Sequence, residues 1–494
     1  MIRRDLFKYV GLAFCVFFIV NGYSQDLNTV HNIHGSVFLD KNKNGVIDKN
    51  ERGLKNILIS NGVDIVKTDS KGGYQIPLKN GQSLFPILPS TYKLTGKTNS
   101  NIINANYYYF HPDSAVNITN SFNFLVNNQS LAEKFRVGAI GDIQIDNEEE
   151  LGFAASSIAS ELANSKDIDF NIFLGDLVND KLDLLSPVKE LLENIPTPSW
   201  TLLGNHDRDV IKEYAMNNAF NTHYGADTYS FNYGKVHFIV LNNVFATGKR
   251  TYEGRINTDQ LQFVKNDLAH VDKKTTVVIS HHIPMYATRN RDDLFQLLEG
   301  YENVLILSGH THVVSRHNYN KGTIHEIGAG ATCGTWWRGE KNNDGIPDAV
   351  MQCGSPRGYF LIDFDKGKYS FKYKAIGMDK SKQMRLTLDS NQIVANIFGG
   401  SDSTLVKYRI NDGEWQLMKK TRVADSYVSN IVQRNKAKIY PTEGNTVNPL
   451  RERNSSHIWT ADKSVINYQL PFKIEVKATD NFGFDVEEHF VLFQ

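Results

Sequence analysis

The feature that most constrains the fold is a series of apolar segments in the middle of the chain, each of which ends in a polar cluster. These segments are "FRVGAIGDIQI", "DFNIFLGDLV", "PSWTLLGNHD", "TTVVISHH" and "NVLILSGHTH". Between them lie stretches with apolar residues at helical spacing, such as Glu148–Asn164 and Leu182–Glu193. Strands that alternate with helices predict a layered α/β fold, in which functional sites collect where the strands end. We therefore expect the polar clusters to meet in one place.

The regions on either side show the period-two alternation of β-strands and no helical spacing of useful length. Residues 35–125 contain short apolar runs separated by turn residues, which predicts a small β-sandwich. After about Gln383, the alternation in "FKIEVKATD" and "EHFVLF" predicts a second sandwich of Ig-like character. The predicted divisions are a signal peptide (1–25), an N-terminal β-sandwich (26–130), a central α/β domain (131–385) and a C-terminal β domain (386–494).

The N-terminal segment has the three parts of a secretory signal. A basic start, "MIRR", precedes an apolar run from Tyr9 to Val20 and a short polar exit. That run is too short to span a bilayer comfortably, so we expect cleavage near Ser24 or Gln25. The mature protein would then be secreted or periplasmic, without a transmembrane segment. An uncleaved membrane anchor is the alternative.

The overall charge gives no sign of a polyanionic partner. The chain has 54 Lys and Arg against 54 Asp and Glu, and no basic stripe. No nucleic-acid partner is therefore expected, because such proteins usually carry a concentrated basic surface. Any chemistry on a phosphate group must come from a local site.

The polar clusters contain the ligand types that a pair of divalent metal ions requires, namely a shared carboxylate and a shell of oxygen and imidazole groups. Asp142 and Asp176 follow apolar segments, and Asn205 offers an amide oxygen. His310 and His312 are alternate residues after the last segment. Two such ions generate hydroxide at neutral pH and offset the charge on phosphoryl oxygens. These are two of the requirements for hydrolysing a phosphate ester.

The ordered set "GDIQ", "GDLVND", "GNHD", "SHHIP" and "GHTH" resembles the calcineurin-like metallophosphoesterase superfamily over about Phe135 to His317. The resemblance implies an αββα sandwich with a dinuclear metal centre and a small-molecule phosphoester as substrate. Together with the β-rich flanks, it extends to a secreted bacterial subgroup, in which the catalytic domain lies between an N-terminal and a C-terminal β domain.

The resemblance also implies two sets of metal ligands. The first ion would be held by Asp142, Gln144, Asp176 and His312. The second ion would share Asp176 and would be completed by Asn205, His282 and His310. The superfamily's usual form is His-x-Pro, which selects His282 because Pro284 follows at the right offset; His281 is the alternative.

The catalytic roles follow from the same resemblance. His206 would donate a proton to the leaving group, and Asp207 would orient it. The expected function is hydrolysis of a phosphate ester, phosphodiester or diphosphate bond by attack of a metal-bridging hydroxide. The alternative is a surface adhesion or carbohydrate-binding protein with an inactive phosphoesterase-like core. A nuclease is less attractive because the charge is balanced.

Gln144 departs from the superfamily's pattern, in which this position usually holds a histidine. An amide oxygen can coordinate a divalent ion but is harder and a poorer donor than imidazole. We therefore expect Mn²⁺, with Mg²⁺, Fe or Zn²⁺ as alternatives. Superfamily members that cleave ADP-ribose and CDP-alcohol diphosphates also carry Asp-x-Gln, which favours a diester or diphosphate substrate.

A second metal signal lies near the N-terminus, where "DKNKNGVIDKNE" matches the calcium-loop pattern at every defined position. The expected ligands are Asp40, Asn42, Asn44, the carbonyl of Val46, Asp48 and Glu51. The flanks are strand-like, so the segment is no true EF-hand. It resembles the calcium-stapled loops of bacterial surface modules, and a plain polar turn is the alternative.

Residues 328–358 leave two questions open. Trp336, Trp337, Arg338 and Arg357 either form a substrate rim or pack as a bridge to the C-terminal domain. Cys333 and Cys353 either form a disulfide in an oxidising compartment or remain free buried thiols.

Overall fold

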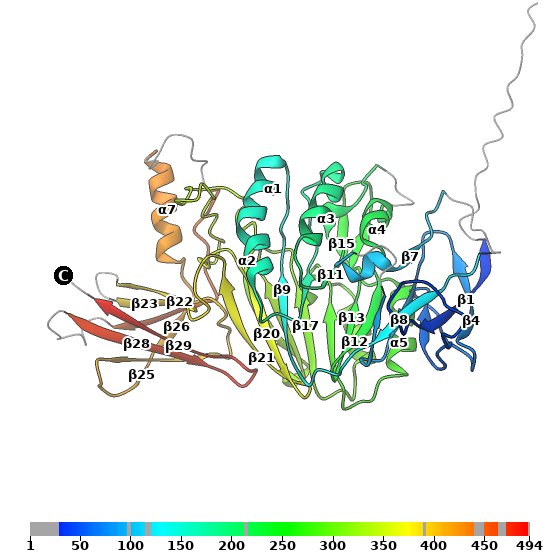
Figure 1. Ribbon diagram of the computed structural model, residues 1–494. Helices are drawn as coiled ribbons and strands as arrows, with labels where there is room; N and C mark the ends of the chain where they lie inside the picture. Colours follow the sequence, from blue (N-terminus) through cyan, green and yellow to red (C-terminus); the bar gives the residue numbers. More distant parts are fainter. Residues whose placement is uncertain are drawn as a thin grey trace, which may run out of the picture.

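The computed structural model describes residues 29–95, 100–113, 120–211, 216–388, 392–438, 449–462 and 471–492. The chain forms three parts in a row, with the N-terminal β domain at one end, the C-terminal β domain at the other and the α/β domain between them (Figure 1). The predicted signal peptide, residues 1–25, lies outside the described residues. Within the described part of the chain, no helix is both long and apolar enough to cross a membrane.

The central domain contains two large sheets. The first has the order β11 (Ser199–Thr201), β10 (Phe170–Phe173), β9 (Lys134–Ile140), β20 (Gly358–Asp365) and β21 (Lys368–Ala375). The second has the order β12 (Tyr229–Tyr233), β13 (Val236–Val240), β16 (Thr276–Ser280), β17 (Val304–Ser308), β19 (Ile324–Ala329) and β18 (Val314–Tyr319). Strands β9 to β11 are parallel, and so are β13, β16, β17 and β19. Their carboxyl ends therefore lie along one edge of each sheet.

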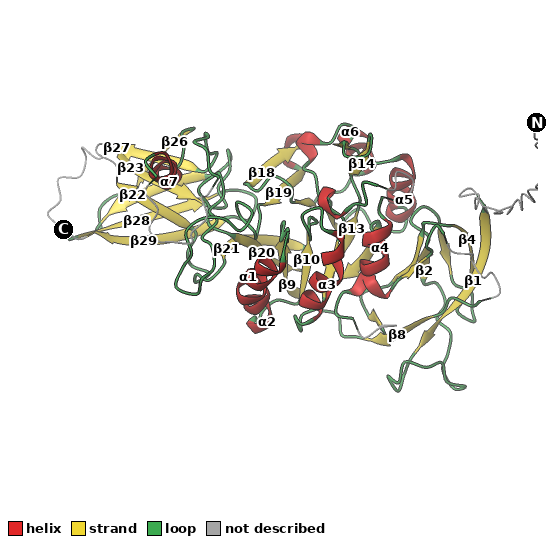
Figure 2. Cartoon of the chain, turned by 90° about the horizontal axis from the view of Figure 1, so that it is seen from above, coloured by secondary structure: helices red, strands yellow, loops and turns green. Residues whose placement is uncertain are grey.

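Helices cover the outer faces of the two sheets. On one side lie α1 (Glu148–Ala154), α2 (Ser160–Asn164) and α3 (Leu185–Glu193), and on the other lie α5 (Thr258–Leu268) and α6 (Arg291–Leu297) (Figure 2). A further short helix, α4 (Asn218–Tyr224), contacts α3. The predicted αββα sandwich is thus confirmed. The predicted helix at residues 148–164 is present as α1 and α2 joined by a π-helical turn.

The two sheets pack through aromatic side chains. Phe170 of β10 and Phe238 of β13 have ring centroids 5.4 Å apart, and Phe135 of β9 lies 6.4 Å from the same Phe238 ring. Strands β10, β13, β16 and β17 are buried at every residue, which explains why their sequences are continuously apolar instead of alternating. Burying each such side chain contributes about 1.5–3 kcal/mol, so the sheets form a rigid base for the loops at their ends.

The N-terminal domain is a sandwich of two four-stranded sheets, as predicted. One sheet contains β4 (Gly73–Lys79), β1 (Val30–Leu39), β8 (Phe124–Asn128) and β6 (Tyr92–Leu94), and the other contains β3 (Ile65–Lys67), β2 (Leu58–Ser60), β5 (Ser83–Ile87) and β7 (Tyr108–Tyr109). The buried Asn104 amide donates to the carbonyl oxygens of Thr201 and Tyr224 at 3.2 and 2.8 Å. These bonds attach the N-terminal domain to the central domain.

The C-terminal domain also consists of two four-stranded sheets. One contains β22 (Met384–Leu388), β23 (Gln392–Ile397), β27 (Ile458–Asp462) and β26 (Lys419–Thr421), and the other contains β25 (Gln416–Leu417), β24 (Leu405–Ile410), β28 (Phe472–Thr479) and β29 (Asp485–Leu492). The predicted boundary after residue 385 falls inside β22, so this domain begins slightly earlier than expected.

One helix of the C-terminal domain, α7 (Ser426–Lys436), was not predicted. Asp425 caps its N-terminus by accepting from the backbone N–H groups of Tyr427 and Val428. Its buried residues Val428, Ile431 and Val432 have helical spacing, but the segment is short and lies within a region whose other signals are strand-like.

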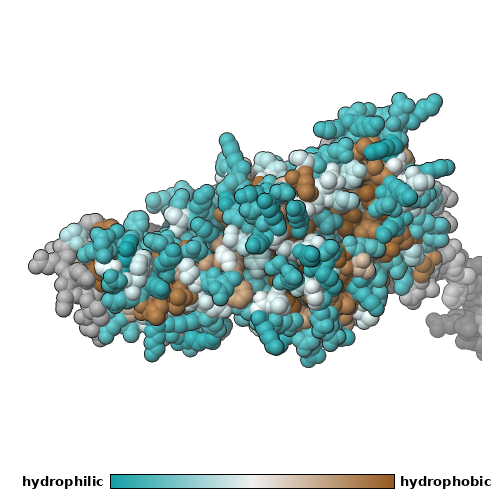
Figure 3. All heavy atoms as spheres, turned by 90° about the horizontal axis from the view of Figure 1, so that it is seen from below, coloured by the Kyte–Doolittle hydropathy of each residue, from teal (hydrophilic) through white to brown (hydrophobic). Residues whose placement is uncertain are grey.

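Apolar side chains gather towards the N-terminal domain on the face seen from below (Figure 3). A cavity of about 240 Å³ lies at the starts of β10 and β11, and Leu88, Phe170, Trp200 and Phe231 are among its lining residues. The predicted polar clusters follow the opposite, carboxyl ends of the same strands. The chemistry of the site therefore belongs to the other edge of the sheets.

Candidate metal centre

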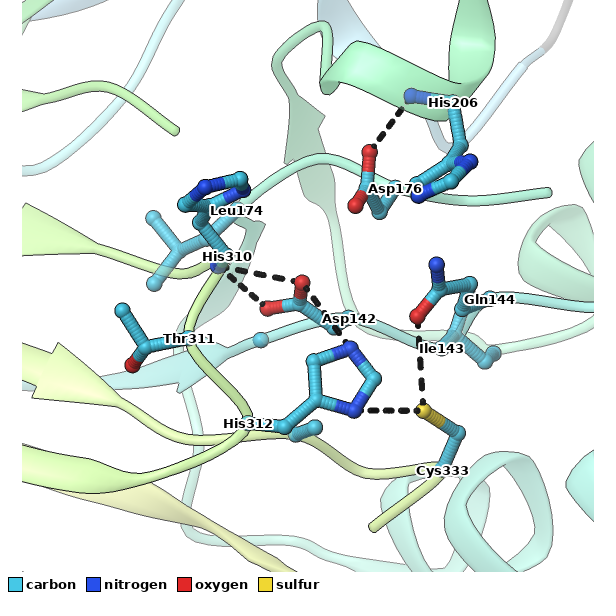
Figure 4. A network of polar contacts seen from close by, with 12 residues as sticks. Asp142, Ile143, Gln144, Leu174, Asp176, His206, His310, Thr311, His312 and Cys333 are labelled. Atoms are coloured by element: carbon cyan, nitrogen blue, oxygen red, sulfur yellow. Dashed lines mark hydrogen bonds and ion pairs between the residues drawn. The ribbon is translucent and has the colours of Figure 1, made fainter. Parts of the chain in front are cut away.

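The polar clusters meet at the carboxyl edges of the two sheets, as the fold predicts. The close-up in Figure 4 shows Asp142, which follows β9, beside Asp176, which follows β10, and His310, which follows β17. Close backbone approach makes this possible. A Cβ on Gly204 would lie 2.2 Å from Asp176 Oδ1, so a side chain at this position would displace the carboxylate.

The loops that carry the predicted ligands are held in an unusual backbone conformation. The φ angles are positive at Asp142 (33°), Gln144 (44°), Asp176 (50°), His310 (75°) and His312 (51°). A non-glycine residue in this region costs about 1–3 kcal/mol, and such residues cluster at functional sites where packing holds them in place. This backbone conformation turns the side chains of these loops towards a shared centre.

Asp176, His282 and His310 form the most compact group, with ligand atoms within 4.8 Å of one another. His282 Nε2 lies 3.2 Å from Asp176 Oδ2 and 3.0 Å from Asn205 Oδ1. The other ring nitrogen, Nδ1, lies 2.8 Å from the carbonyl oxygen of Leu174. A carbonyl partner fixes the proton on Nδ1 and leaves Nε2 as a metal ligand.

The structure distinguishes the two neighbouring histidines of "SHHIP". His281 is fully buried, and its Nδ1 lies 3.3 Å from the side-chain amide of Asn243. Its Nε2 has no hydrogen-bond partner among the described residues, and burial lowers the pKa of His281 to about 3. His282, not His281, therefore joins the ligand group.

A second group contains Asp142, Gln144 and His312, which lie close to one another in Figure 4. The backbone N–H of His310 donates to both carboxylate oxygens of Asp142 at 3.0 and 2.9 Å. His312 Nε2 lies 3.7 Å from Asp142 Oδ1, while its Nδ1 lies 2.6 Å from the carbonyl oxygen of Gly334. His312 thus has the same arrangement as His282, with a backbone carbonyl on Nδ1 and an aspartate carboxylate near Nε2.

Gln144 is buried within this second group and has two side-chain neighbours. Its amide donates to Asn179 Oδ1 at 3.3 Å, and its Oε1 lies 3.8 Å from Cys333 Sγ. Cys333 Sγ also lies 3.7 Å from His312 Nδ1. Cys333 and Cys353 are both free and buried, so the alternative without a disulfide is the one observed. The contact of Cys333 with the site was not foreseen.

Three carboxyl groups of the site are almost fully buried, which calls for compensating positive charge. Burial raises the pKa of Asp142 well above its usual value, and burial together with Asp176 raises the pKa of Asp207 to about 7. Burial also opposes the charged form of Asp176, but His282 outweighs it and lowers the pKa of Asp176. Buried carboxylates are stable when they are paired or coordinate metals, so this donor set fits divalent cations.

One predicted role is wrong in the structure, namely that of Asp207 as the group that orients His206. Asp207 accepts three backbone N–H groups, from Leu177, Val178 and Gly204, at 2.8, 3.0 and 2.8 Å, so its carboxylate ties two loops together. The carboxylate beside His206 is Asp180, whose Oδ1 lies 2.9 Å from His206 Nδ1. Asp180 was present in the quoted "GDLVND", but its role could not be read from spacing.

Sequence profiles match nearly the whole described chain. The profile of calcineurin-like phosphoesterase matches residues 135–314. Profiles of the N-terminal and C-terminal parts of calcineurin-like phosphoesterase match residues 41–128 and 326–485. The chain belongs to the calcineurin-like phosphoesterases. It is therefore a metal-dependent hydrolase that acts on phosphoester bonds.

A comparison with solved structures gives distant matches. Purple acid phosphatase PPD1 from yellow lupin seeds is 15% identical, with 65% of this chain and 67% of that chain covered and a TM-score of 0.35. GAP50 of Plasmodium is 16% identical, with 49% and 84% covered and a TM-score of 0.33. Phosphopantetheinyl hydrolase from Mycobacterium tuberculosis is 12% identical, with 41% and 91% covered and a TM-score of 0.25. A sequence search of curated proteins gives no match.

The aromatic and basic residues of segment 328–358 have different places in this phosphoesterase. Trp336 is 41% exposed, and its ring lies 4.8 Å from the His312 ring, so it borders the metal centre. Trp337 is buried and donates from Nε1 to the carbonyl oxygen of Ile143 at 2.9 Å. Arg357 is buried against Trp337, and Arg338 is exposed. Of the four, Trp336 lies where the predicted substrate rim would be.

The bridge to the C-terminal domain is made by other residues of the same segment. Tyr427 of α7 donates to Asp348 Oδ2 at 3.0 Å, and Asn396 of β23 donates to the carbonyl oxygen of Cys353 at 3.0 Å. Trp337 and Arg357 instead stabilise the loop that carries Gln144. Trp337 donates to the carbonyl oxygen of Ile143, and Arg357 donates to Ser157 Oγ in the π-helical turn between α1 and α2.

Two residues beside the metal centre were missed in the sequence analysis. The Arg208 guanidinium lies 5.0 Å over the ring of Tyr252, and that ring lies 6.1 Å from His310. Arg208 also donates to the carbonyl oxygen of Asn205 at 3.1 Å. It is 3% exposed, and no carboxylate of a described residue lies within ion-pair distance. Its position directly after "GNHD" was the available signal.

Proposed function

We propose that this phosphoesterase is an exported enzyme that uses two divalent metal ions to hydrolyse a phosphodiester or diphosphate bond. The proposal is supported by the compact group of Asp176, His282 and His310, and by the second group of Asp142 and His312 nearby, whose neighbour Gln144 donates from its backbone N–H to the backbone carbonyl of Asp176. Export rests on the signal-like sequence of residues 1–25. An inactive core is disfavoured because the buried carboxylates and oriented imidazoles are all retained.

The proposed ligands divide between two ions. The first ion would be held by Asp142, Gln144, Asp176 and His312. The second would be held by Asp176, Asn205, His282 and His310. When bound, the ions supply Lewis acidity towards the phosphoryl oxygens and lower the pKa of water.

The proton for the leaving oxygen is assigned to His206. Its Nδ1 is held by Asp180 at 2.9 Å, which leaves Nε2 available, and its ring is partly exposed. The His206 backbone N–H donates to Asp176 Oδ1 at 2.9 Å, so the proton donor is fixed to the proposed bridging carboxylate. This attachment places general acid and metal ligands in one rigid unit.

The experiment that tests the proposal is metal removal followed by reloading. Protein stripped of metal and reloaded with Mn²⁺ is expected to hydrolyse bis(p-nitrophenyl) phosphate or ADP-ribose faster than p-nitrophenyl phosphate. Mn²⁺ is expected to reactivate better than Zn²⁺, because Gln144 offers a neutral oxygen where imidazole would favour Zn²⁺. Gln144→His should move the preference towards Zn²⁺. Best reactivation of the wild type by Zn²⁺, or hydrolysis of monoesters alone, would contradict the proposal.

We also propose that the loop from Asp40 to Glu51 binds Ca²⁺. Asp48 Oδ2 accepts from the side-chain amides of Asn42 and Asn44 at 2.7 and 2.9 Å, so three of the predicted ligands face one another. Asp40 is buried and accepts from Gly45 N–H at 3.1 Å. A side-chain amide carries a nitrogen donor and an oxygen acceptor at its end. If the amides of Asn42 and Asn44 rotate by half a turn, their oxygens replace their nitrogens beside Asp48.

Millimolar Ca²⁺ is expected to raise the melting temperature of the protein. With a dissociation constant of about 10⁻⁴–10⁻³ M, as in extracellular modules, 10 mM Ca²⁺ would stabilise by roughly 1.4–2.7 kcal/mol. Differential scanning calorimetry with Ca²⁺, with Mg²⁺ and with added chelator checks this expectation. Glu51→Gln should remove the response to Ca²⁺. An equal shift with Mg²⁺, or the same Ca²⁺ response in Glu51→Gln, would show that the loop is a plain turn.

A further inference from the structure

A polar cavity of about 370 Å³ lies beside the metal centre, between the N-terminal and central domains. The N-terminal domain contributes Gln82 and Tyr109 among its lining residues, and the central domain contributes Arg208, Asn221, Asp227 and Gln260. Tyr109 OH donates to Asn218 Oδ1 at 2.8 Å, so the two domains are joined at the cavity wall. We call this cavity the amide pocket, because several asparagine and glutamine residues line it.

Two amide groups of the pocket have an unused hydrogen-bonding end. Asn221 Oδ1 and Gln260 Oε1 have no partner among the described residues, and both residues are only 5% exposed. The other end of Gln260 donates to Thr228 Oγ1 at 3.0 Å. Leaving a buried polar atom unpaired costs about 1–3 kcal/mol, so a ligand that offers a hydrogen bond to either atom would remove this cost.

A carboxylate lies on the same wall. Asp227 Oδ2 accepts from the side-chain amides of Asn217 and Asn242 at 2.7 and 3.0 Å. These bonds hold the carboxylate in a fixed orientation within the lining. Together with Asn221 and Gln260, it gives the pocket a set of acceptors that suits hydroxyl groups.

Arg208 connects the wall of the amide pocket with the metal centre. This side chain lines the pocket, and its Nε donates to the carbonyl oxygen of Asn205. The side chain of Asn205 in turn lies 3.0 Å from His282 Nε2. A substrate whose phosphate is at the metal centre would therefore extend its remaining part past Arg208 into the pocket.

We propose that the amide pocket binds the hydroxyl-rich part, a sugar or polyol, of the phosphoester substrate. This inference rests on the proposed function. A hydroxyl group both donates and accepts, so it satisfies an amide in either orientation. The pocket volume is that of a small-ligand site. A nucleobase fits less well, because Phe245 on the wall is already covered by the Arg255 guanidinium at 4.7 Å from its ring.

The test compares substrates with and without a hydroxyl-rich group in Gln260→Met and Asn221→Leu, which remove the amides with little change in volume. In the Mn²⁺-loaded enzyme, kcat/KM for glycerophosphoinositol or ADP-glucose should fall roughly tenfold or more. The value for bis(p-nitrophenyl) phosphate, which lacks hydroxyl groups, should stay unchanged. The first probe represents a lipid headgroup and the second a sugar nucleotide, so the affected probe identifies the source.

The matched control is Gln262→Met on the exposed face of the same helix, α5, which should leave every rate unchanged. Equal losses on all substrates, or no loss on either hydroxylated probe, would overturn the proposal. If the wild type hydrolyses none of these compounds, the proposed function fails instead. The pocket is then tested by saturation-transfer NMR with myo-inositol and glucose 1-phosphate. Binding that is lost in Gln260→Met supports the pocket, and absence of binding to the wild type overturns it.

Discussion

The Asp176→Asn variant is expected to lose phosphoesterase activity by roughly 10²–10⁴-fold. The substitution keeps the shape of the side chain but removes the charge that lies 3.2 Å from His282 Nε2. Removing one partner of a buried charged pair costs about 3–5 kcal/mol, and here the same carboxylate is proposed to serve both metal ions. Metal affinity and the rate should therefore fall together, which steady-state kinetics at several Mn²⁺ concentrations would measure.

A matched control is Asp183→Asn, an exposed carboxylate close in sequence with no role in the site. It should retain wild-type kinetics. Full activity of Asp176→Asn at low Mn²⁺ would show that no bridging carboxylate is needed. Activity restored to the wild-type rate by excess Mn²⁺ would assign Asp176 to metal affinity alone.

The His206→Ala variant is expected to lose roughly 10²–10⁴-fold in kcat on substrates with poor leaving groups. Aryl esters should be affected much less, because a phenolate leaves with little help from a proton. The comparison of glycerophosphoinositol, whose leaving group is an alkoxide, with bis(p-nitrophenyl) phosphate measures this difference. An equal loss on both would mean that His206 acts in substrate binding and not as a general acid.

The structure adds a second variant to that test. Asp180 and not Asp207 lies beside His206, at 2.9 Å from Nδ1. Asp180→Asn should therefore reproduce part of the His206→Ala pattern, with a loss of roughly 10–100-fold that is confined to poor leaving groups. Asp180→Asn with unchanged leaving-group dependence would show that the contact does not orient the ring.

The core of this fold could be predicted because its local signals and its packing agree. Strands such as β10 and β17 are buried on both faces, so their sequences are continuously apolar and easy to detect. Parallel strands then bring the residues after them to one edge, which is why Asp142, Asp176 and His310 could be expected to meet. Periodicity failed at α7, since a short amphipathic helix inside a β domain has too few turns to stand out.

The finer points of the site depend on side-chain directions that spacing does not contain. His281 and His282 are adjacent in sequence, but His282 faces the ligand group while His281 faces Asn243. Asp207 lies next to His206, yet its carboxylate binds backbone N–H groups of another loop. The sequence alone does not predict that Arg208 belongs to the site, because its contact with Tyr252 depends on the fold.

The central claim is that two metal ions share Asp176. It is tested most directly by counting the Mn²⁺ bound to reconstituted protein with inductively coupled plasma mass spectrometry, alongside electron paramagnetic resonance. The account predicts two Mn²⁺ ions per chain with a spin-coupled signal in the wild type, and loss of the coupled signal in Asp176→Asn. A single uncoupled Mn²⁺ per wild-type chain, at saturating metal and with full activity, would contradict it.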